Sequence, residues 1–174
     1  MEIRALLPTD DRTVFSSGDE ALDRFFHRYA GQNQFRHHLG VTYVAVDAGR
    51  VLGFATVAPR HLEIEELPER ERKKLPRYPI PVLGLARLAV DGSARGLGVG
   101  AQLLRFVLEL ALDMVGRVGC AGVVVDAKPG AIEFYAKYGF AAFDVLEGES
   151  DARPRAMPMW LPIDAVKRAR NPAH

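Results

Sequence analysis

The chain has 174 residues, of which 48% are hydrophobic and 26% charged, and its formal net charge is +1. This composition predicts one ordinary globular domain and excludes a disordered chain, a collagen-like chain and a small disulfide-stapled scaffold. The single cysteine, Cys120, cannot form an internal disulfide, which favours a reducing compartment. No apolar stretch reaches the roughly 20 residues of a membrane helix, and no signal peptide is visible. We therefore expect a cytoplasmic protein with no membrane association.

The near-zero net charge is unevenly distributed. Residues 24–46 and residues 72–90 contain no Asp or Glu, and both stretches carry several basic side chains. Arg outnumbers Lys, and Arg is the better bidentate ligand of phosphate. Composition alone leaves two interpretations open, a phosphate-binding surface or an ordinary mixed surface of an arginine-rich protein.

The first elements in chain order are a strand and a helix. Residues 2–7 predict a strand that ends at Pro8. Ser17 and Glu20 fit a capping box, with Ser17 as the N-cap and Glu20 three residues later. Behind them apolar residues recur at helical spacing, so a helix is predicted over about residues 18–30.

A hairpin and a charged connector follow. Residues 42–46 and 51–57 alternate as strands around the turn at 47–50. Residues 59–81 are rich in proline and charge, and their portion 63–74 suits a short helix.

The second half of the chain alternates strands and helices without a repeat or a dividing linker. It predicts one α+β domain with a mixed sheet, a core over about 2–163 and a short basic tail at 164–174. The expected elements are a strand at 82–90, a helix at 99–115, a strand at 121–126, a short helix at 132–138, and strands at 140–145 and 157–163.

The most informative segment is the glycine-rich turn within residues 88–101, between a predicted strand and a predicted helix. Such a turn leaves backbone N–H groups unpaired at the positive end of the helix dipole. Gly98 and Gly100 remove side chains, so a phosphate can approach the backbone closely, and Arg95 adds positive charge. The segment predicts an anion site suited to a pyrophosphate.

Other interpretations of this turn differ in how well they fit. A P-loop needs Gly-Lys-Ser/Thr at the helix start, where this chain has Gly98-Val99-Gly100, so it is excluded. A dinucleotide site places its glycines at another spacing but stays open, because Asp126 lies at a strand end. A turn that merely joins strand to helix also stays open.

A second motif, residues 131–140, contains Phe134-Tyr135 followed by Gly139-Phe140. Together with Arg95-x-x-Gly98-x-Gly100, it makes the chain resemble the GNAT acetyltransferase superfamily over about residues 2–163. The resemblance implies the GNAT fold, a mostly antiparallel sheet of six to seven strands flanked by about four helices. It also implies acetyl-CoA as the acetyl donor and an N-acetyltransferase activity.

The resemblance implies roles at matching positions. Tyr135 is the implied catalytic residue, a general acid that protonates the departing CoA thiolate. Phe134 is implied to line the pantetheine. The remaining implied acetyl-CoA contacts are the strand residues Leu88, Ala89 and Val90 for pantetheine and the loop residues Arg95, Gly96, Leu97, Gly98, Val99, Gly100 and Ala101 for the pyrophosphate.

One position departs from the family pattern. Many members have Asn seven residues before the tyrosine, where this chain has Lys128. This removes one expected polar contact without affecting the predicted fold. Lys128 either reaches the CoA phosphates or lies in solvent.

A narrower resemblance concerns the acceptor. Several segments are similar to the GNAT-type toxins of toxin–antitoxin modules, which acetylate the amino group of aminoacyl-tRNA and stop translation. The resemblance implies a small ribbon-helix-helix antitoxin as partner and a homodimer. The similar segments are residues 15–26, 29–32, 42–44, 81–91 and 159–162.

The chemistry of an aminoacyl ester is compatible with these residues. Its amino group titrates below the ordinary α-amino value of about 7.7–8.0, because the ester withdraws electrons. It therefore needs no strong general base, whereas a lysine acceptor with a pKa of about 10.4 does. No Glu stands on the strand before the loop, at residues 85–88.

The two acid-free stretches supply candidate contacts to tRNA phosphates. His37 and His38 have no metal-ligand partner at a convincing spacing, so we assign no metal. A solvated surface charge is the simpler interpretation of each basic residue taken singly. The RNA-binding candidates are Arg28, Arg36, Lys73, Lys74, Arg77 and Arg87.

Three functions remain open from the sequence. The first is a toxin that acetylates aminoacyl-tRNA. The second is a GNAT enzyme for a small amine or a protein N-terminus, which needs no RNA. The third is a non-catalytic acyl-CoA-binding or interaction module, in which loss of the Tyr135 hydroxyl has no effect.

Overall fold

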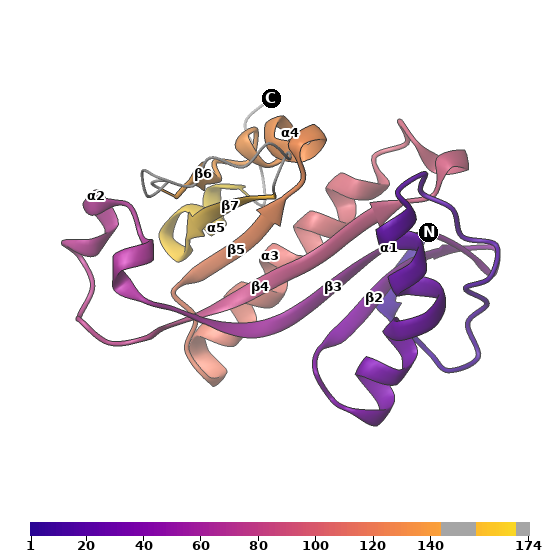
Figure 1. The fold of residues 1–174 in the computed structure, drawn as a ribbon, viewed down its shortest axis with the longest axis horizontal. Coiled ribbons are helices and arrows are strands. Elements are labelled where there is room, and N and C mark those ends of the chain that lie inside the picture. The colour runs from indigo at the N-terminus through magenta and orange to yellow at the C-terminus, as the bar shows by residue number, and fades with distance from the viewer. Residues whose placement is uncertain (144–155, 170–174) are drawn as a thin grey trace. The chain divides into compact units, whose positions relative to one another are not determined.

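The computed structural model describes residues 1–143 and 156–169, and the chain forms two compact units. The first unit contains residues 1–58 and 85–107, and the second contains residues 59–84 and those from 108 onward. Seven strands are hydrogen-bonded in the order β1-β2-β3-β4-β5-β7-β6 (Figure 1). The pairs β1–β2, β2–β3, β5–β7 and β6–β7 are antiparallel. These features confirm the predicted α+β class.

The elements follow the predicted order. The strands are β1 (Glu2–Ala5), β2 (Val41–Asp47), β3 (Arg50–Leu62), β4 (Ile80–Val90), β5 (Gly122–Ala127), β6 (Ala141–Ala142) and β7 (Met157–Pro162). The α-helices are α1 (Glu20–Arg24), α2 (Glu69–Arg72), α3 (Val99–Arg117), α4 (Ile132–Ala136) and α5 (Ile163–Ala169). Two π-helical segments are η1 (Phe25–Tyr29) and η2 (Gln32–Arg36), and 3-10 turns are η3 (Ile64–Glu66), η4 (Gly92–Ala94) and η5 (Pro129–Ala131).

The predicted hairpin is confirmed. Strands β2 and β3 pair up to Asp47 and Arg50, so only Ala48 and Gly49 lie in the turn. Both residues have positive φ angles, 49° and 77°. Two left-handed residues give the turn whose twist matches that of paired strands.

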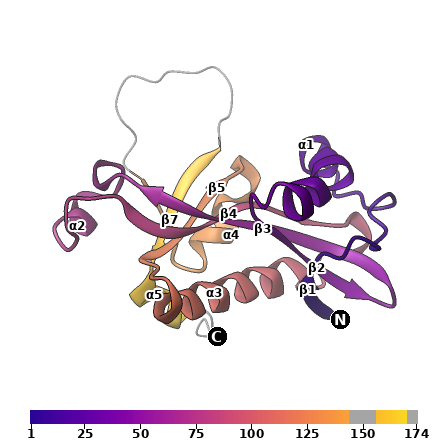
Figure 2. The same ribbon diagram turned by 90° about the horizontal axis from the view of Figure 1, so that it is seen from below.

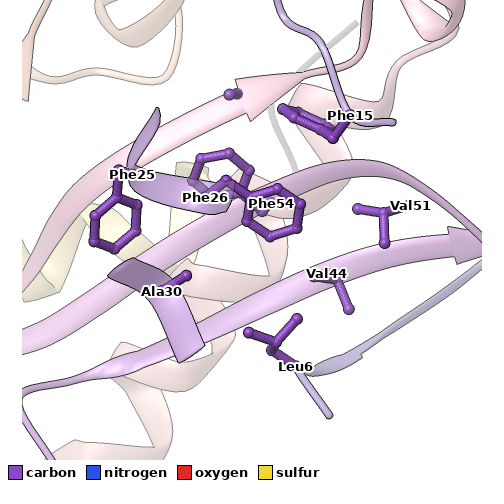
Figure 3. Packing of buried hydrophobic residues seen from close by; sticks show 9 residues of the cluster. Leu6, Phe15, Phe25, Phe26, Ala30, Val44, Val51 and Phe54 are labelled. Carbon is purple, nitrogen blue, oxygen red and sulfur yellow. The ribbon is translucent and has the colours of Figure 1, made fainter. Parts of the chain in front are cut away.

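The core of the first unit lies between the helical segment of residues 20–36 and one face of β2 and β3. The Phe26 ring stacks on the Phe54 ring with centroids 4.4 Å apart, and Phe15 meets both rings edge-on (Figure 3). Val44 joins this cluster from β2. Of the apolar residues that predicted a helix over 18–30, Phe25 and Phe26 are buried and Leu22 packs against the cluster, whereas Tyr29 is exposed.

The first turns of α3 cover the opposite face of these strands (Figure 2). A side-chain carbon at Gly53 would lie 2.9 Å from Leu103 and from Val99. Tyr43 on β2 packs against Phe106, with ring centroids 4.7 Å apart. Glycine at position 53 therefore lets α3 approach β3 closely.

The second unit has its own core around Trp160 on β7. A side-chain carbon at Gly122 would lie 2.4 Å from the Trp160 ring, so glycine makes room for the indole on the neighbouring strand. Helix α5 packs on β5 and β7. The buried residues around Trp160 are Leu62, Leu67, Ile80, Val82 and Val124.

The predicted helix start was wrong. Asp19, not Ser17, is the N-cap, and its carboxylate accepts the N–H of Leu22 at 3.1 Å. Gly18 has a φ of +90°, which breaks the helical path after Ser17. The Ser17 hydroxyl instead bonds Asp23 at 2.6 Å. The predicted single helix is also divided, because α1 passes into η1 at Phe25.

Other boundaries differ from the prediction. The connector helix is shorter than residues 63–74 and consists of η3 and α2. Strand β6 has two residues, and positions 144 and 145 of the predicted strand lie outside the described residues. Residues 163–169 form α5, with Val166 and Ala169 buried, where we expected a basic tail.

Candidate active site

The loop between β4 and α3 is organised by the buried carboxylate of Asp91. This side chain accepts the N–H of Ser16 at 2.9 Å, the N–H of Ser93 at 3.0 Å and the Ser93 hydroxyl at 2.6 Å. The Arg50 guanidinium lies 3.3 Å from it. Asp91 thereby caps the 3-10 turn η4 and joins the loop to the segment that precedes α1.

The environment of Asp91 keeps it charged. Burial alone would raise the pKa of Asp91, but the hydrogen bonds from Ser93 and Ser16 and the charge of Arg50 outweigh burial, so its pKa lies below the ordinary value. Sequence reasoning missed this residue. Asp followed by Gly-Ser directly after a strand is a turn-capping signal that could have identified it.

The glycines give the loop its open form. Gly96 and Gly98 have φ angles of +76° and +79°, and a side-chain carbon at either position would meet no atom within 4 Å. We expected Gly98 and Gly100 to be the two positions whose missing side chains let a phosphate approach the backbone. The left-handed positions are Gly96 and Gly98, whereas Gly100 lies inside α3.

The first turn of α3 presents unpaired backbone donors. The N–H of Gln102 donates the first hydrogen bond of the helix, to the carbonyl of Gly98 at 3.1 Å. The N–H groups of Val99, Gly100 and Ala101 come before it and have no acceptor within the helix. No acidic residue lies in this turn. The loop and helix start therefore fit a diphosphate, because backbone donors and the helix dipole both favour an anion there.

Arg95 lies at the exposed edge of the same loop. Its guanidinium donates a hydrogen bond to the carbonyl of Ser17 and lies against Gly18. Among the described residues, no carboxylate forms an ion pair with Arg95. A neutral carbonyl fixes the side chain while leaving its charge uncompensated.

The predicted pantetheine strand also belongs to the first unit. Ala89 is buried, while Leu88 and Val90 are partly buried. The N–H of Asp91 bonds the carbonyl of Leu52 at 2.8 Å, which fixes the end of β4. The structure thus brings the predicted residues of 88–101 together as one strand, loop and helix start.

Tyr135 and Phe134 lie on α4 in the second unit. Tyr135 is 4% exposed, and its ring meets Phe134 and Phe140 edge-on at 5.1 and 5.6 Å between centroids. Burial raises the pKa of the Tyr135 hydroxyl, which therefore carries its proton at neutral pH. No described residue forms a hydrogen bond with this hydroxyl. Gly139, at a φ of +96°, follows the helix as predicted.

The RNA-binding candidates differ in their surroundings. Arg28 lines an open hollow that also contains Glu20 and Asp23. Lys73 lies 3.9 Å from Glu69, and both side chains are exposed. The acid-free sequence stretches are therefore not acid-free surfaces. The candidates fall into two groups, Arg28, Arg36 and Arg87 in the first unit and Lys73, Lys74 and Arg77 in the second.

Metal-binding and membrane features are missing from the described part of the chain. In residues 1–143 and 156–169, no group of three or more His, Cys, Asp and Glu side chains is placed to hold a metal ion. None of the helices described there is long and apolar enough to cross a bilayer.

Residues 38–142 match the acetyltransferase (GNAT) domain family. The chain is 34% identical over 140 residues to the tRNA-acetylating toxin of Mycobacterium tuberculosis (strain ATCC 25618 / H37Rv), covering 79% of this chain and 82% of the relative. The structure of AtaT complexed with acetyl-methionyl-tRNAfMet superimposes with a TM-score of 0.81 at 27% identity, over 95% of this chain and 96% of that one. The structure of AtaTR bound with AcCoA gives a TM-score of 0.76 at 29% identity, over 95% of both chains.

This chain therefore belongs to the GNAT acetyltransferase family, as the sequence motifs indicated. Acetyl-CoA is the acetyl donor of that family. Asp126, on which the dinucleotide alternative depended, forms an ion pair with Arg60 at 3.4 Å.

Proposed function

We propose that this protein transfers the acetyl group of acetyl-CoA to the amino group of an amino acid esterified to tRNA, and thereby stops translation. The observation that carries the proposal is the similarity, over 95% of this chain, to AtaT in complex with acetyl-methionyl-tRNAfMet. The 34% identity to a tRNA-acetylating toxin supports the same acceptor.

The proposed acetyl-CoA site uses the strand and loop of the first unit. Backbone donors of residues 95–101 and the charge of Arg95 hold the pyrophosphate. Leu88, Ala89 and Val90 offer backbone groups to pantetheine, as an added strand would use them. Phe134 lines the pantetheine.

Tyr135 is proposed as the general acid. The thiol of CoA leaves better when its sulfur receives a proton, and a thiol has a pKa of roughly 8.5. A tyrosine whose pKa is raised by burial holds its proton until that thiolate forms. When the amine attacks the thioester carbon, the C–S bond breaks and the phenol proton passes to sulfur. The amine then releases a proton to solvent, and the phenolate takes up a proton from solvent, which restores Tyr135.

The acceptor amine requires no strong base on the enzyme. An aminoacyl ester lowers the pKa of its own amino group, so much of it is neutral at cellular pH. Strand β4 carries Leu85, Ala86 and Arg87 directly before the proposed pantetheine contacts, with no carboxylate among them. This composition supports a low-pKa amine over lysine.

The same relatives support an antitoxin as partner. AtaT is solved in a structure of AtaTR, and another structure shows the AtaT-AtaR complex bound to DNA. We propose a ribbon-helix-helix antitoxin, a homodimer and a cytoplasmic location where charged tRNA is available. The exposed candidates are proposed to contact tRNA phosphates, namely Arg28, Arg36, Lys73, Lys74 and Arg77, whereas Arg87 lies over the Phe25 ring.

Competition between acceptors tests this proposal. Purified protein is given acetyl-CoA with charged tRNA, uncharged tRNA, a peptide with a free N-terminus and a small amine in one reaction. We expect acetyl transfer to charged tRNA only. Transfer to the peptide or small amine with none to charged tRNA would contradict the proposal and identify a different GNAT acceptor.

A further inference from the structure

The first unit contains a cavity of about 220 Å³ that the acetyl-CoA site does not use. It is formed by the segment containing η1 and η2 on one side and by residues of β2, β3 and β4 on the other. π-Helical turns are rare and occur frequently at functional sites. The lining includes the apolar residues Phe25, Ala30, Leu39, Ala58 and Ala86 and the polar residues Asn33, Gln34, Thr42, Thr56 and Arg87.

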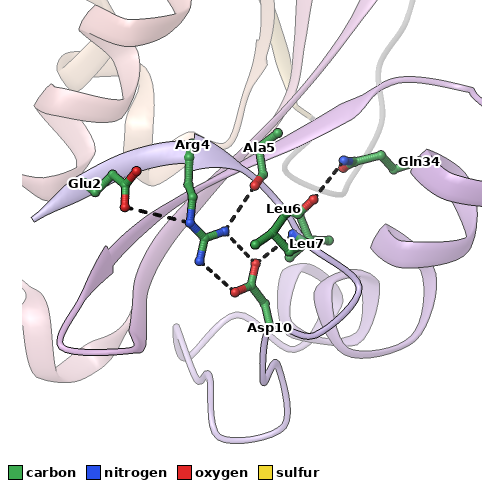
Figure 4. Close-up of polar contacts among 7 residues, drawn as sticks. All are labelled: Glu2, Arg4, Ala5, Leu6, Leu7, Asp10 and Gln34. Atoms are coloured by element: carbon green, nitrogen blue, oxygen red, sulfur yellow. Dashed lines mark hydrogen bonds and ion pairs between the residues drawn. The ribbon is translucent and has the colours of Figure 1, made fainter.

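Polar groups inside the cavity are largely bonded to one another. The hydroxyls of Thr42 and Thr56 lie 2.7 Å apart, and both residues are buried. The Gln34 amide donates to the carbonyl of Leu6 at 3.1 Å (Figure 4). It also accepts the N–H of Thr42 at 2.8 Å. These bonds join η2 to β2 and to Leu6, the residue that follows β1.

Arg87 is the charged residue of this lining. Its guanidinium carbon lies 3.7 Å from the centre of the Phe25 ring, an arrangement in which a cation is attracted to the aromatic face. No carboxylate in the described residues forms an ion pair with it. Burial lowers the pKa of Arg87, but an arginine side chain stays protonated in proteins. The cavity therefore contains one positive charge that is half-buried and not neutralised.

The position of Arg87 along β4 connects the cavity to the proposed acetyl-CoA site. Ala86 and Arg87 immediately precede Leu88–Val90, the proposed pantetheine contacts, and successive strand residues advance by about 3.3 Å. A pantetheine arm that starts at the loop after Val90 and runs back along β4 brings its thioester end toward Arg87. The cavity thus opens where an acceptor amine has to arrive.

We propose that this cavity receives the side chain of the amino acid carried by the tRNA, and that it accepts uncharged side chains and rejects cationic ones. This inference rests on the proposed function. A volume of about 220 Å³ is below that of sites for drug-sized ligands and suits a single side chain. The apolar lining favours uncharged side chains, and Arg87 repels the side chains of Lys and Arg.

The test is the order of preference among charged tRNAs. The full chain is given acetyl-CoA and tRNAs charged with alanine, methionine, leucine or lysine, and initial rates are compared. We expect methionyl- or leucyl-tRNA to react at least about tenfold faster than lysyl-tRNA. Equal rates for lysyl- and methionyl-tRNA would overturn the inference.

Two substitutions assign that preference to the cavity. Ala86→Leu fills part of it and is expected to lower the rate with methionyl- or leucyl-tRNA about tenfold relative to alanyl-tRNA. Arg87→Met removes the charge while keeping a long side chain over Phe25, and it is expected to raise the relative rate with lysyl-tRNA. The controls are Ala21→Leu and Arg105→Met, at exposed positions on α1 and α3 outside the cavity.

The outcomes separate this inference from the proposed function. If the unaltered protein acetylates no charged tRNA, the proposed function fails and the cavity inference fails with it. If it acetylates charged tRNA but neither cavity variant changes the order of preference, only the cavity inference fails. Acetyl-CoA binding measured on each variant shows whether the fold is intact. If Ala21→Leu or Arg105→Met changes the order of preference among charged tRNAs to the same extent as the cavity variants, the inference is also contradicted.

Discussion

Among single residues, the proposed acetyl transfer depends first on the Tyr135 hydroxyl. Tyr135→Phe removes the proposed acid and keeps the ring that packs on Phe134 and Phe140. Because no described group bonds the hydroxyl, we expect its loss to change the free energy of unfolding by less than about 1 kcal/mol. The acetylation rate should fall by about 10²- to 10⁴-fold, the usual contribution of a general acid.

Acetyl-CoA titration by calorimetry provides the control for this variant, because the phenol is not proposed to bind the donor. We expect affinity for acetyl-CoA close to that of the unaltered protein. A variant that binds acetyl-CoA and acetylates at the full rate would show that Tyr135 is only a core aromatic residue.

Asp91 gives a second prediction at this scale. Asp91→Ala leaves the N–H groups of Ser16 and Ser93 without their acceptor, so we expect the free energy of unfolding to fall by about 2–3 kcal/mol and acetyl-CoA binding to weaken. Urea denaturation measures the first effect. Ser93→Ala is the milder comparison, because it removes only the hydroxyl. Equal stability of Asp91→Ala and the unaltered protein would refute the anchoring role.

The charge of Asp91 also predicts a pH dependence. Its folded pKa is lowered, so its contribution to stability is present above the unfolded value of about 3.9 and is lost as the pH falls through the folded pKa. Asp91→Asn should therefore lose less stability than the unaltered protein between neutral pH and that acidic range. Parallel acid titrations of both proteins, followed by circular dichroism, measure this difference, and identical curves would contradict it.

At the scale of elements, the glycine-rich loop allows a matched comparison. Gly98 and Gly49 have φ angles of +79° and +77°, and neither has an atom within 4 Å of its side-chain position. Gly98→Ala and Gly49→Ala should therefore lower the free energy of unfolding by the same amount, about 1 kcal/mol, because alanine is strained at a positive φ. Only Gly98→Ala should weaken acetyl-CoA binding, about tenfold, since only that loop is proposed to hold the pyrophosphate. Equal affinity in both variants would argue against this site.

The elements also show what local sequence can predict. The hairpin turn, the start of α3 and the glycine after α4 were predictable, because each depends on backbone angles that few residues adopt. The cap at Asp19 was not, because Ser17 is an equally good cap in sequence and Gly18 alone decides against it. The π-helical segments were missed because the spacing of apolar residues does not distinguish a π-turn from an α-turn. Phe25 and Phe26, which are buried in η1, fit an α-helical pattern equally well.

The candidate site divides in the same way. The loop residues and Tyr135 could be proposed from the sequence because they form two contiguous motifs. The cavity could not, since Thr42, Thr56 and Arg87 come from three strands and only the pairing of those strands brings them together. Local sequence patterns predict sites formed by residues that are neighbours in the chain. Side-chain clusters formed by distant strands can be recognised only once the pairing of those strands is known.

At the scale of the whole molecule, a net charge of +1 limits how the proposed tRNA substrate can be bound. The sequence stretches without acidic residues suggested basic surfaces, but Glu69 lies 3.9 Å from Lys73, and Arg28 lines the same hollow as Glu20 and Asp23. Long-range attraction to tRNA is therefore modest, and recognition must depend on a few local contacts. Where such contacts lie in space could not be predicted from charge counts along the chain.

The expected consequence is a shallow salt dependence. Replacing Arg28 and Arg36 together by Gln should weaken binding of charged tRNA and lower the slope of log affinity against log salt by about 1 to 2, since each phosphate contact contributes about 0.7 to 0.9. Filter binding over a salt series measures this slope. Arg105→Gln, an exposed position on α3, should leave it unchanged, and an unchanged slope in the double variant would remove both residues from the RNA surface.

The most direct test of the central claim identifies the acetylated atom. Charged tRNA is incubated with acetyl-labelled acetyl-CoA and either the unaltered protein or Tyr135→Phe, and the ester is then hydrolysed and the products are separated by mass spectrometry. We expect labelled N-acetyl amino acid from the unaltered protein, about 10²- to 10⁴-fold less from Tyr135→Phe, and none from uncharged tRNA. Acetyl label on the RNA itself, or no labelled amino acid despite measured acetyl-CoA binding, would contradict it.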